Sequence, residues 1–455
     1  MTIKELSWIH VVRKRYKAIV DAYAAAIRSG RLLPGHRLPT HRALAAEHGI
    51  SLATATRAYA ELEGMGLVSG ETGRGTFVRE ISLPAGLGVN QYAVAADVLD
   101  LNFNYPALPE QAELLRSALR RLATQGDLDA LLRYQPHAGK TGEREMIAAW
   151  LRGTGLRAAA EQLLLVNGAQ HGLAVVVMGL LRPGDVVAVD ALTYPGFKSL
   201  AALYRIELVP LPVTAGGPNL AALKQLCRQR RVRALYAMPT LHNPLGWVLS
   251  HQQRREIAAI ARQYDLLIIE DAAYAYLVRN PPPPLAYFAP ERTLYVTGFS
   301  KNIATGLRVG VVVTPAAYQP ALEQAIRATS WNTPSVMTAL VCGWLQDGTV
   351  SRLERLKRRD ARRRQKLARE LLAPLEVTGH PNAYFVWLPL PDEVRADAVV
   401  RRLMDQRISV SAAEPFSTTQ NVPHAIRLAL GSVSLAALTQ ALAAVRETIA
   451  YARDL

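Results

Sequence analysis

The pattern of hydrophobic and polar residues divides the chain into two parts. In the first part, apolar residues recur at helical spacing over residues 9–29, and two shorter helical stretches follow Thr40 and Ser51, each of which can cap a helix. Gly49 separates these stretches, and residues 66–78 predict two short strands around a glycine-rich tip. These elements predict a helix-turn-helix with a wing, although a protein-docking module of three helices and a hairpin fits the periodicity equally well.

From residue 98 onward, apolar runs typical of strands alternate with amphipathic helical stretches. This alternation predicts an α/β fold with a parallel sheet that is covered by helices on both faces. Residues 80–97 contain Pro, Gly and small residues without clear periodicity, which is typical of a linker. We therefore expect an α+β winged helix over residues 1–79, a linker over residues 80–97 and the α/β domain over residues 98–455.

The composition is that of an ordinary globular protein, but the charge is strongly positive. The chain has 53 Lys and Arg against 37 Asp and Glu, a net charge of +16 that favours a polyanionic partner such as nucleic acid. Cys227 and Cys342 form no C-x-x-C pair, which excludes a disulfide framework and a structural zinc site. The longest apolar run, residues 173–181, is too short to cross a bilayer. We therefore expect a cytoplasmic protein without a metal or a membrane partner.

Three polar residues follow three successive apolar strands of the second part. Asn243, Asp271 and Lys301 each come just after such a strand, and ligands of open α/β sheets bind at that edge. Taken singly, an Asn before Pro is usually a turn, an Asp after a strand is often a helix cap, and a Lys in a loop is usually solvated. Their joint placement at one edge of the sheet indicates a binding site.

The chemistry that requires this set of residues is that of pyridoxal 5′-phosphate. A lysine amine forms a Schiff base with this cofactor, and a carboxylate keeps its ring nitrogen protonated. Asn243 and Tyr274 can serve the ring hydroxyl, while residues 167–170 open a helix and can hold the phosphate together with Arg308. Tyr194 can stack on the ring, or it can simply pack in a turn beside Pro and Gly.

Residues 32–78 resemble the winged helix of the GntR regulator family over its whole length. Arg74 stands at the tip of the expected wing, where it can reach phosphate or the minor groove. By position, the resemblance implies that operator DNA is contacted by Arg42, Thr54, Arg57 and Thr76. Leu52 stands where the family often has a basic residue. Because leucine can touch a thymine methyl but cannot bridge guanine, we expect an altered operator preference.

Residues from about 98 to 455 resemble fold-type I enzymes of the aspartate aminotransferase kind. The resemblance rests on SK-x6-R-x-G from residue 300, HNP-x-G from residue 242 and GAQ from residue 168. It implies a three-layer α/β domain with a smaller α+β subdomain, bound pyridoxal 5′-phosphate and a homodimer with shared sites. By position, it makes Lys301 the Schiff-base lysine and Asp271 the partner of the ring nitrogen. It further implies Asn243 and Tyr274 at the ring hydroxyl, Gly168, Ala169, Gln170 and Arg308 at the phosphate, Arg427 at a ligand carboxylate, and Tyr134 at the phosphate of the neighbouring subunit.

The second part departs from that family at three positions. Gly298 stands where a Ser or Thr usually binds the phosphate, so we expect weaker cofactor binding. Leu245 replaces the usual Thr of the NP-T-G motif. Tyr105 stands where a small Gly commonly lies beside the substrate, and a bulky side chain there is expected to narrow the pocket and to slow transamination.

A basic run remains outside both sites. Residues 352–369 contain ten Lys and Arg against the acidic Glu354 and Asp360, and their leucines suggest a helix with one apolar edge. This helix is expected to be a solvated connection between the large and small parts of the α/β domain, or else a second surface that contacts DNA.

A GntR-like winged helix fused to an aminotransferase-like domain is the arrangement of the MocR subfamily of bacterial regulators. The resemblance implies a homodimeric transcription factor that binds operator DNA and whose cofactor-bearing domain senses a small amine, an amino acid or the cofactor itself. The alternative is an active aminotransferase with an accessory N-terminal module. The intact helix-turn-helix and the bulky Tyr105 favour the regulator.

Overall fold

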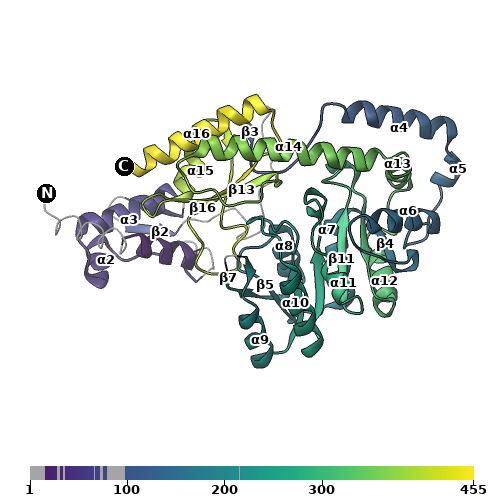
Figure 1. Cartoon of the computed structure of the whole chain (residues 1–455). Coiled ribbons are helices and arrows are strands. Elements are labelled where there is room, and N and C mark those ends of the chain that lie inside the picture. Colours follow the sequence, from purple (N-terminus) through teal and green to yellow (C-terminus); the bar gives the residue numbers. More distant parts are fainter. Residues whose placement is uncertain are drawn as a thin grey trace.

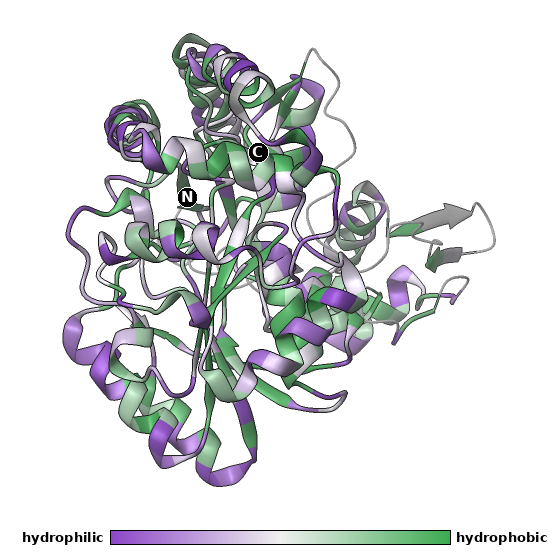
Figure 2. Cartoon of the chain, turned by 90° about the vertical axis from the view of Figure 1, so that its right-hand side faces the viewer, coloured by the Kyte–Doolittle hydropathy of each residue, from purple (hydrophilic) through white to green (hydrophobic). Residues whose placement is uncertain are grey.

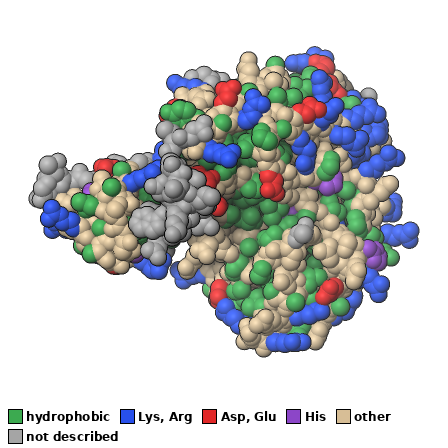
Figure 3. All heavy atoms as spheres, turned by 60° about the vertical axis from the view of Figure 1, so that its left-hand side comes forward, with side chains coloured by type: hydrophobic (Ala, Val, Ile, Leu, Met, Phe, Trp, Pro, Cys, Tyr) green, Lys and Arg blue, Asp and Glu red, His purple; other side chains and the backbone are tan. Residues whose placement is uncertain are grey.

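The computed structural model describes residues 16–27, 31–33, 36–65, 67–71, 75–78, 98–214 and 216–454. The winged helix and the α/β domain lie side by side, and the winged helix forms a lobe on the flank of the larger domain (Figures 1 and 3). The expected linker at residues 80–97 and the expected contact residue Arg74 lie outside the described residues.

The N-terminal domain has the elements that its sequence predicts. A helix over residues 16–27, α2 (His41–His48) and α3 (Leu52–Gly64) enclose a small apolar core, and β1 (Val68–Glu71) pairs antiparallel with β2 (Gly75–Val78). Thr40 and Ser51 cap α2 and α3, because each side chain accepts a hydrogen bond from a backbone N–H in the first turn. Gly49 ends α2 with a left-handed φ of 59°, a conformation that glycine adopts without strain.

The large domain is built on a seven-stranded sheet in the order β4-β12-β11-β10-β9-β5-β6. The strands are β4 (Leu163–Val166), β5 (Val186–Asp190), β6 (Glu207–Leu211), β9 (Val232–Ala237), β10 (Leu267–Asp271), β11 (Thr293–Gly298) and β12 (Gly310–Val313). The sheet is parallel as predicted, except that β12 runs antiparallel to both of its neighbours. The strands are largely apolar because both faces are covered (Figure 2).

Two layers of helices cover this sheet. The helices of the large domain are α4 (Gln111–Gln125), α5 (Leu128–Leu131), α6 (Thr141–Arg152), α7 (Gly168–Leu180), α8 (Pro195–Leu203), α9 (Leu220–Gln229), α10 (His251–Gln263), α11 (Leu285–Phe288), α12 (Gln319–Thr329) and α13 (Ser335–Gln346). Along β4, Leu164 packs in the core beneath α7 and α12, whereas Leu163 and Leu165 pack on the opposite side beneath α6 and α13. This alternation is the reason that one strand supports two helical layers.

A smaller α+β subdomain follows, as the resemblance implied. Its sheet has the order β13-β16-β15, and β14 pairs with the first strand of the domain, β3. The elements are β3 (Leu99–Asp100), β13 (Phe385–Pro389), β14 (Ile408–Ser409), β15 (Ser411–Ala412), β16 (Ala425–Ala429), α15 (Ala396–Asp405) and α16 (Leu435–Asp454). The long helix α14 (Thr349–Leu372) runs from the large domain to this subdomain, as expected of the basic run (Figure 1).

Candidate functional site

The residues expected to hold the cofactor gather at the carboxyl edge of the large sheet. Asp271 is the last residue of β10, Lys301 follows β11 by three residues, and Asn243 lies in the loop after β9. These strands are neighbours and run parallel, so their carboxyl ends meet at one edge. The topology therefore brings together three residues that are spread over almost 60 positions of the sequence, from Asn243 to Lys301.

Asp271 is a buried carboxylate with two fixed hydrogen bonds. It is 2% exposed, and it accepts hydrogen bonds from the Tyr236 hydroxyl at 2.9 Å and from the Ala273 backbone N–H at 3.0 Å. Burial raises the pKa of Asp271, and these two hydrogen bonds oppose the rise. A carboxylate that is oriented in this way fits a protonated ring nitrogen.

Tyr236 was not singled out in the sequence, although a signal for it exists. Tyr236 lies on β9 and pairs with Ile269 of the neighbouring strand β10. Because Ile269 is two residues before Asp271, the side chains of Tyr236 and Asp271 point to the same face of the sheet. Its ring stacks on Phe197 at 3.8 Å with an interplanar angle of 5°. Phe197 thereby fixes the hydroxyl that orients the carboxylate.

The loop that carries Lys301 is held from beneath by a second lysine. Lys301 Nζ donates to the Asn104 carbonyl at 2.8 Å, and its own carbonyl accepts from the Tyr276 hydroxyl at 2.8 Å and from Lys357 Nζ at 3.0 Å. Lys357 also donates to the Ile303 carbonyl at 2.6 Å. Burial, followed by the charge of Lys301, lowers the pKa of Lys357 to about 7.

The sequence gives little sign of the role of Lys357, because this residue lies within the basic run. Its only local signal is its position four residues after Leu353, on the apolar edge of α14. A lysine on that edge has to find acceptors inside the protein, and the carbonyls around Lys301 supply them.

The N-terminus of α7 and Arg308, expected to hold the phosphate, lie against each other. Gly168 begins α7 with a φ of +79°, and a Cβ there would lie 2.7 Å from Arg308 Nη2. The Arg308 guanidinium donates to the Ser300 hydroxyl and to the Asn167 carbonyl, both at 3.2 Å. Ala169 and Gln170 follow Gly168 in the first turn, where backbone N–H groups have no helical partner. The helix dipole and the guanidinium together favour a phosphate here.

The glycine at position 298 has a steric cause. A Cβ on Gly298 would lie 2.9 Å from the Val309 carbonyl oxygen and 3.4 Å from the Ala169 nitrogen. The end of β11, the start of β12 and the start of α7 therefore approach too closely for a side chain. Ser300, which sequence reasoning did not single out, instead brings a hydroxyl to Arg308.

Asn243, Tyr274 and Tyr194 surround the same edge. Asn243 and Tyr274 are buried, and Asn243 Oδ1 has no hydrogen-bond partner among the described residues. Tyr194 is the residue before α8, and burial raises its pKa, so it stays neutral. A Cβ on Gly196 would lie 2.4 Å from the Tyr194 ring and 2.5 Å from Gln170 Oε1, which shows how closely these groups approach.

Arg427 reaches the site from the smaller subdomain. It lies on β16 and is 4% exposed, its Nη1 donates to the Asn102 carbonyl at 2.8 Å, and its guanidinium lies 5.0 Å from the centre of the Phe385 ring. Within the described part of the chain its Nε has no partner. A buried guanidinium with an open N–H is suited to a carboxylate.

The structure does not bring Tyr134 to the site of its own chain. Tyr134 is 83% exposed and packs against Trp331, with ring centres 5.4 Å apart. Tyr105 is 43% exposed and stacks on Phe103 at 5.8 Å, while its neighbour Asn104 contacts Lys301. Leu245 packs in an apolar cluster of the subdomain side.

The expected DNA-contacting residues lie either at the starts of α2 and α3 and on the wing, or farther along α3 beside the smaller subdomain. Arg42 and Leu52 are exposed at the starts of α2 and α3, and the Thr54 hydroxyl lies 2.8 Å from that of the capping Ser51. Thr76 is half-buried on β2. Arg57 lies farther along α3, with its guanidinium 5.2 Å from the centre of the Tyr16 ring.

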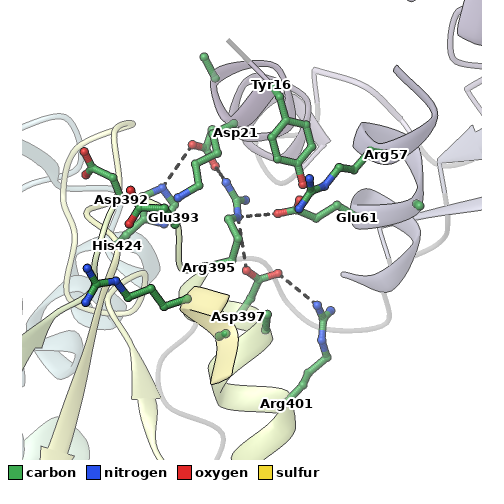
Figure 4. Close-up of a pocket in the computed structure, with 16 residues that line it drawn as sticks. Tyr16, Asp21, Arg57, Glu61, Asp392, Glu393, Arg395, Asp397, Arg401 and His424 are labelled. Atoms are coloured by element: carbon green, nitrogen blue, oxygen red, sulfur yellow. Dashed lines mark hydrogen bonds and ion pairs between the residues drawn. The ribbon is translucent and has the colours of Figure 1, made fainter. Parts of the chain in front are cut away.

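Arg57 lines a cavity of about 630 Å³ between the winged helix and the subdomain (Figure 4). Across this cavity, Arg395 pairs with Asp21 at 2.6 Å and with Glu61 at 2.7 Å, and His424 Nε2 lies 3.4 Å from Asp21. Burial acts to raise the pKa of Asp21, but the hydrogen bonds and charges of His424 and Arg395 outweigh it and lower the pKa. No local pattern in the sequence could have revealed this contact.

The described residues contain no helix that could cross a membrane. They also contain no group of three or more His, Cys, Asp and Glu side chains that could hold a metal ion.

These features define a fold-type I, pyridoxal-phosphate-dependent type of domain joined to a winged helix-turn-helix. The sequence model described as aminotransferase class I and II matches residues 96–445, and the chain belongs to that family. A second model, described as bacterial regulatory proteins of the gntR family, matches residues 15–78. This is the MocR-like architecture that the sequence predicted, and the aminotransferase match implies pyridoxal 5′-phosphate as the cofactor.

Proteins named as transcriptional regulators and proteins named as aminotransferases both resemble this chain. An uncharacterized HTH-type transcriptional regulator of Bacillus subtilis, YdeF, is 28% identical over 91% of this chain and 90% of its own length. The 2-aminoadipate transaminase of Thermus thermophilus is 29% identical over 72% of this chain and 83% of its own length. The crystal structure of LysN, the α-aminoadipate aminotransferase of the same bacterium, matches with a TM-score of 0.71 and 25% identity over 79% of this chain and 94% of its own. The chain is thus a transcriptional regulator with an aminotransferase-like domain.

Proposed function

We propose that this regulator binds operator DNA as a homodimer and that a small amine or amino acid, bound around Lys301, changes its affinity for DNA. The observation that carries the proposal is that β16 and the residue before it connect the cofactor edge to the winged helix. Arg427 lies on this strand at the cofactor edge, and His424, immediately before the strand, contacts Asp21 of the winged helix. A ligand that moves β16 therefore acts on the contact between the two domains.

The residues at the carboxyl edge fit pyridoxal 5′-phosphate. When bound, this cofactor supplies an aldehyde carbon that links reversibly to amines and a ring that withdraws electrons. Lys301 is then the residue that carries it, and Asp271 holds the proton on the ring nitrogen. The remaining assignments are Asn243 and Tyr274 at the ring hydroxyl, Tyr194 against the ring, and Gly168, Ala169, Gln170 and Arg308 at the phosphate.

Unpartnered polar atoms support this assignment. Asn243 Oδ1, Gln170 Oε1 and Arg427 Nε are buried without a hydrogen bond in the described part of the chain. Leaving such an atom unsatisfied costs roughly 1–3 kcal/mol, so several at one edge of a sheet indicate a site shaped for a polar ligand.

The contact between the domains is suited to transmit the change. Arg395 is 9% exposed and joins acidic residues of the winged helix, Asp21 and Glu61, to the start of α15 (Figure 4). Breaking one partner of such a buried pair leaves a charge without compensation, so we expect the contact to switch between two arrangements rather than to deform gradually. A differential affinity of about 1–3 kcal/mol between these states would suffice for a typical effector.

The homodimer is supported by exposed apolar side chains. Leu132 and Tyr134 follow α5 and are 85% and 83% exposed, which is unusual for large apolar residues. In a dimer, Tyr134 can reach the phosphate of the neighbouring subunit. Because a protein that binds operator DNA works where the chromosome lies, we place it in the cytoplasm.

A second candidate is slow transamination by the same site. The 43% exposure of Tyr105 favours it, because a side chain that is not packed into the interior need not fill the space beside Lys301. The likeness to the 2-aminoadipate transaminase has the same implication. We nevertheless expect turnover far below the ~10 s⁻¹ of typical enzymes.

The test measures DNA affinity and the cofactor spectrum on the same protein. Operator fragments are first selected from genomic DNA, and binding is then titrated with and without amines and amino acids that shift the visible band. We expect at least one such ligand to change operator affinity by about 5–150-fold. Arg427→Ala should abolish the response to ligands that carry a carboxylate while retaining ligand-free DNA binding. Operator affinity that is indifferent to every band-shifting ligand, together with turnover at enzyme-like rates, would establish the aminotransferase instead.

A further inference from the structure

The long helix α14 has one buried face and one strongly basic face. Its buried face includes Leu353, Lys357, Ala361 and Ala368. At 3.6 residues per turn, six exposed basic residues fall within a sector of about 120° on the opposite side. We call these residues the outer stripe: Arg355, Arg359, Arg362, Arg363, Lys366 and Arg369.

The charge of the outer stripe is almost uncompensated. Arg355, Arg359 and Arg363 make no hydrogen bond or ion pair with any described residue. Arg362 and Arg369 donate only to neutral oxygens, at 3.3 Å to Asn382 and at 2.7 Å to the Gly379 carbonyl. Lys366 pairs at 3.7 Å with Glu370, and both of these side chains are well exposed.

Other arginines of the same helix behave differently. Arg364 is buried and pairs with Asp360 at 2.8 Å, Arg352 pairs with Glu110 at 3.3 Å, and Arg358 donates to the Tyr276 carbonyl. These arginines hold the fold together, whereas Arg355, Arg359 and Arg363 make no such contact with the described residues. Like charges at i,i+4 on a helix instead repel one another and destabilise the helix. A partner of opposite charge would remove this repulsion.

We propose that the outer stripe of α14 binds the phosphate backbone of operator DNA, beyond the segment that the winged helix contacts. This chain already carries a DNA-binding domain, and that domain docks on the subdomain into which α14 runs (Figure 1). The stripe extends over 14 residue steps, or about 21 Å, which is the length of roughly six base pairs. The proposal rests on DNA binding by the winged helix and is independent of the effector response.

The test compares two duplexes and two triple variants of the full-length protein. The short duplex is the smallest that the protein still binds in a manner dependent on Arg42, and the long duplex extends it by 20 base pairs on each side. One variant carries Arg355→Gln, Arg359→Gln and Arg363→Gln. The matched control carries Arg152→Gln, Arg231→Gln and Arg255→Gln, which remove the same charge from exposed positions elsewhere on the domain.

We expect the wild-type protein to bind the long duplex more tightly than the short one, and the α14 variant to lose this advantage. On the long duplex, the slope of log K against log salt concentration should fall by about 2.7 for each subunit, or about 5.4 for the homodimer, if each arginine neutralises one phosphate. Binding of the short duplex, the cofactor spectrum and the melting temperature should stay as in the control variant.

Equal loss in the α14 and control variants would overturn the proposal, since it would reflect net charge alone. Unchanged binding of both duplexes by the α14 variant would also overturn it. Binding to vesicles of anionic phospholipid is measured as well. If the α14 variant loses binding to these vesicles but keeps its binding to both duplexes, the stripe belongs to a membrane-binding surface and the proposal is wrong. The effector response, measured on the short duplex, stays a separate readout, so a failure here leaves the proposed function standing.

Discussion

The cofactor edge and the expected DNA-contacting surface place their side chains in opposite environments. Asp271 and Arg427 are buried, and neighbouring side chains or carbonyls fix each of them in position. Arg42 and Leu52, in contrast, are exposed at the starts of their helices. A small ligand can be met by preorganised groups, whereas DNA is a polymer that itself orders the side chains it touches. Substitutions at the cofactor edge should therefore act through geometry, and those on the DNA surface mainly through charge.

The largest effect is expected for Lys301→Ala. Without this amine the cofactor has no covalent link to the protein, so the absorption band of the Schiff base should be lost completely, and any cofactor that stays bound should absorb as the free aldehyde. The control is Lys366→Ala, which removes an exposed lysine and should retain the band. Retention of the band by Lys301→Ala would mean that another lysine carries the cofactor.

Gly168→Ala tests the geometric side of the comparison. The new Cβ would lie 2.7 Å from the Arg308 guanidinium at a φ of +79°, and the left-handed backbone alone costs an alanine about 1–2 kcal/mol. We expect cofactor affinity, measured by titration of the apoprotein, to fall at least about tenfold. Gly142→Ala is the matched control, because a Cβ there meets no atom within 4 Å. Equal affinity in both variants would show that the α7 N-terminus does not hold the phosphate.

Arg42→Ala and Arg57→Ala test the charge side. If Arg42 contacts a phosphate, Arg42→Ala should weaken operator binding across sequences and lower the salt slope by about one for each subunit bound. Arg57→Ala should also weaken binding, but to a smaller extent, because this residue lies over Tyr16 at the cavity between the domains. Neither variant should alter the visible band. A larger effect of Arg57 than of Arg42 would place the DNA farther along α3 than we expect.

The smallest effect is a pH dependence that arises at Lys357. Its folded pKa of about 7 lies below the 10.5 of an unfolded lysine, so between these values the unfolded chain binds more protons. The free energy of unfolding of the wild-type protein should therefore rise with pH relative to that of Lys357→Met, from pH 6 to pH 9. Melting temperatures measured across this range check it, with the exposed Lys366→Met as the control. Parallel curves for the wild-type protein and Lys357→Met would show that Lys357 keeps its ordinary pKa.

Much of the local architecture follows from residue spacing. The caps Thr40 and Ser51 and the glycine break between them predict the helix-turn-helix, because capping depends on atoms within one turn. The strand-end positions of Asn243, Asp271 and Lys301 predict one shared edge, because parallel strands bring their carboxyl ends together. The structure differs from the predicted parallel sheet at β12, which runs antiparallel to its neighbours. An apolar run in the sequence predicts a buried strand but not its direction.

The sequence by itself determined the two domains, the family resemblance and the residue types at the cofactor edge. Only the tertiary structure decided which groups orient them: Tyr236 on Asp271, Lys357 beneath Lys301 and the close approach that requires Gly298. It also decided the contact of Arg395 with Asp21, residues 374 positions apart. The physical reason is the separation in sequence of the residues that interact. Caps, amphipathic faces and strand ends depend on neighbours along the chain, whereas these contacts depend on how whole layers and domains pack.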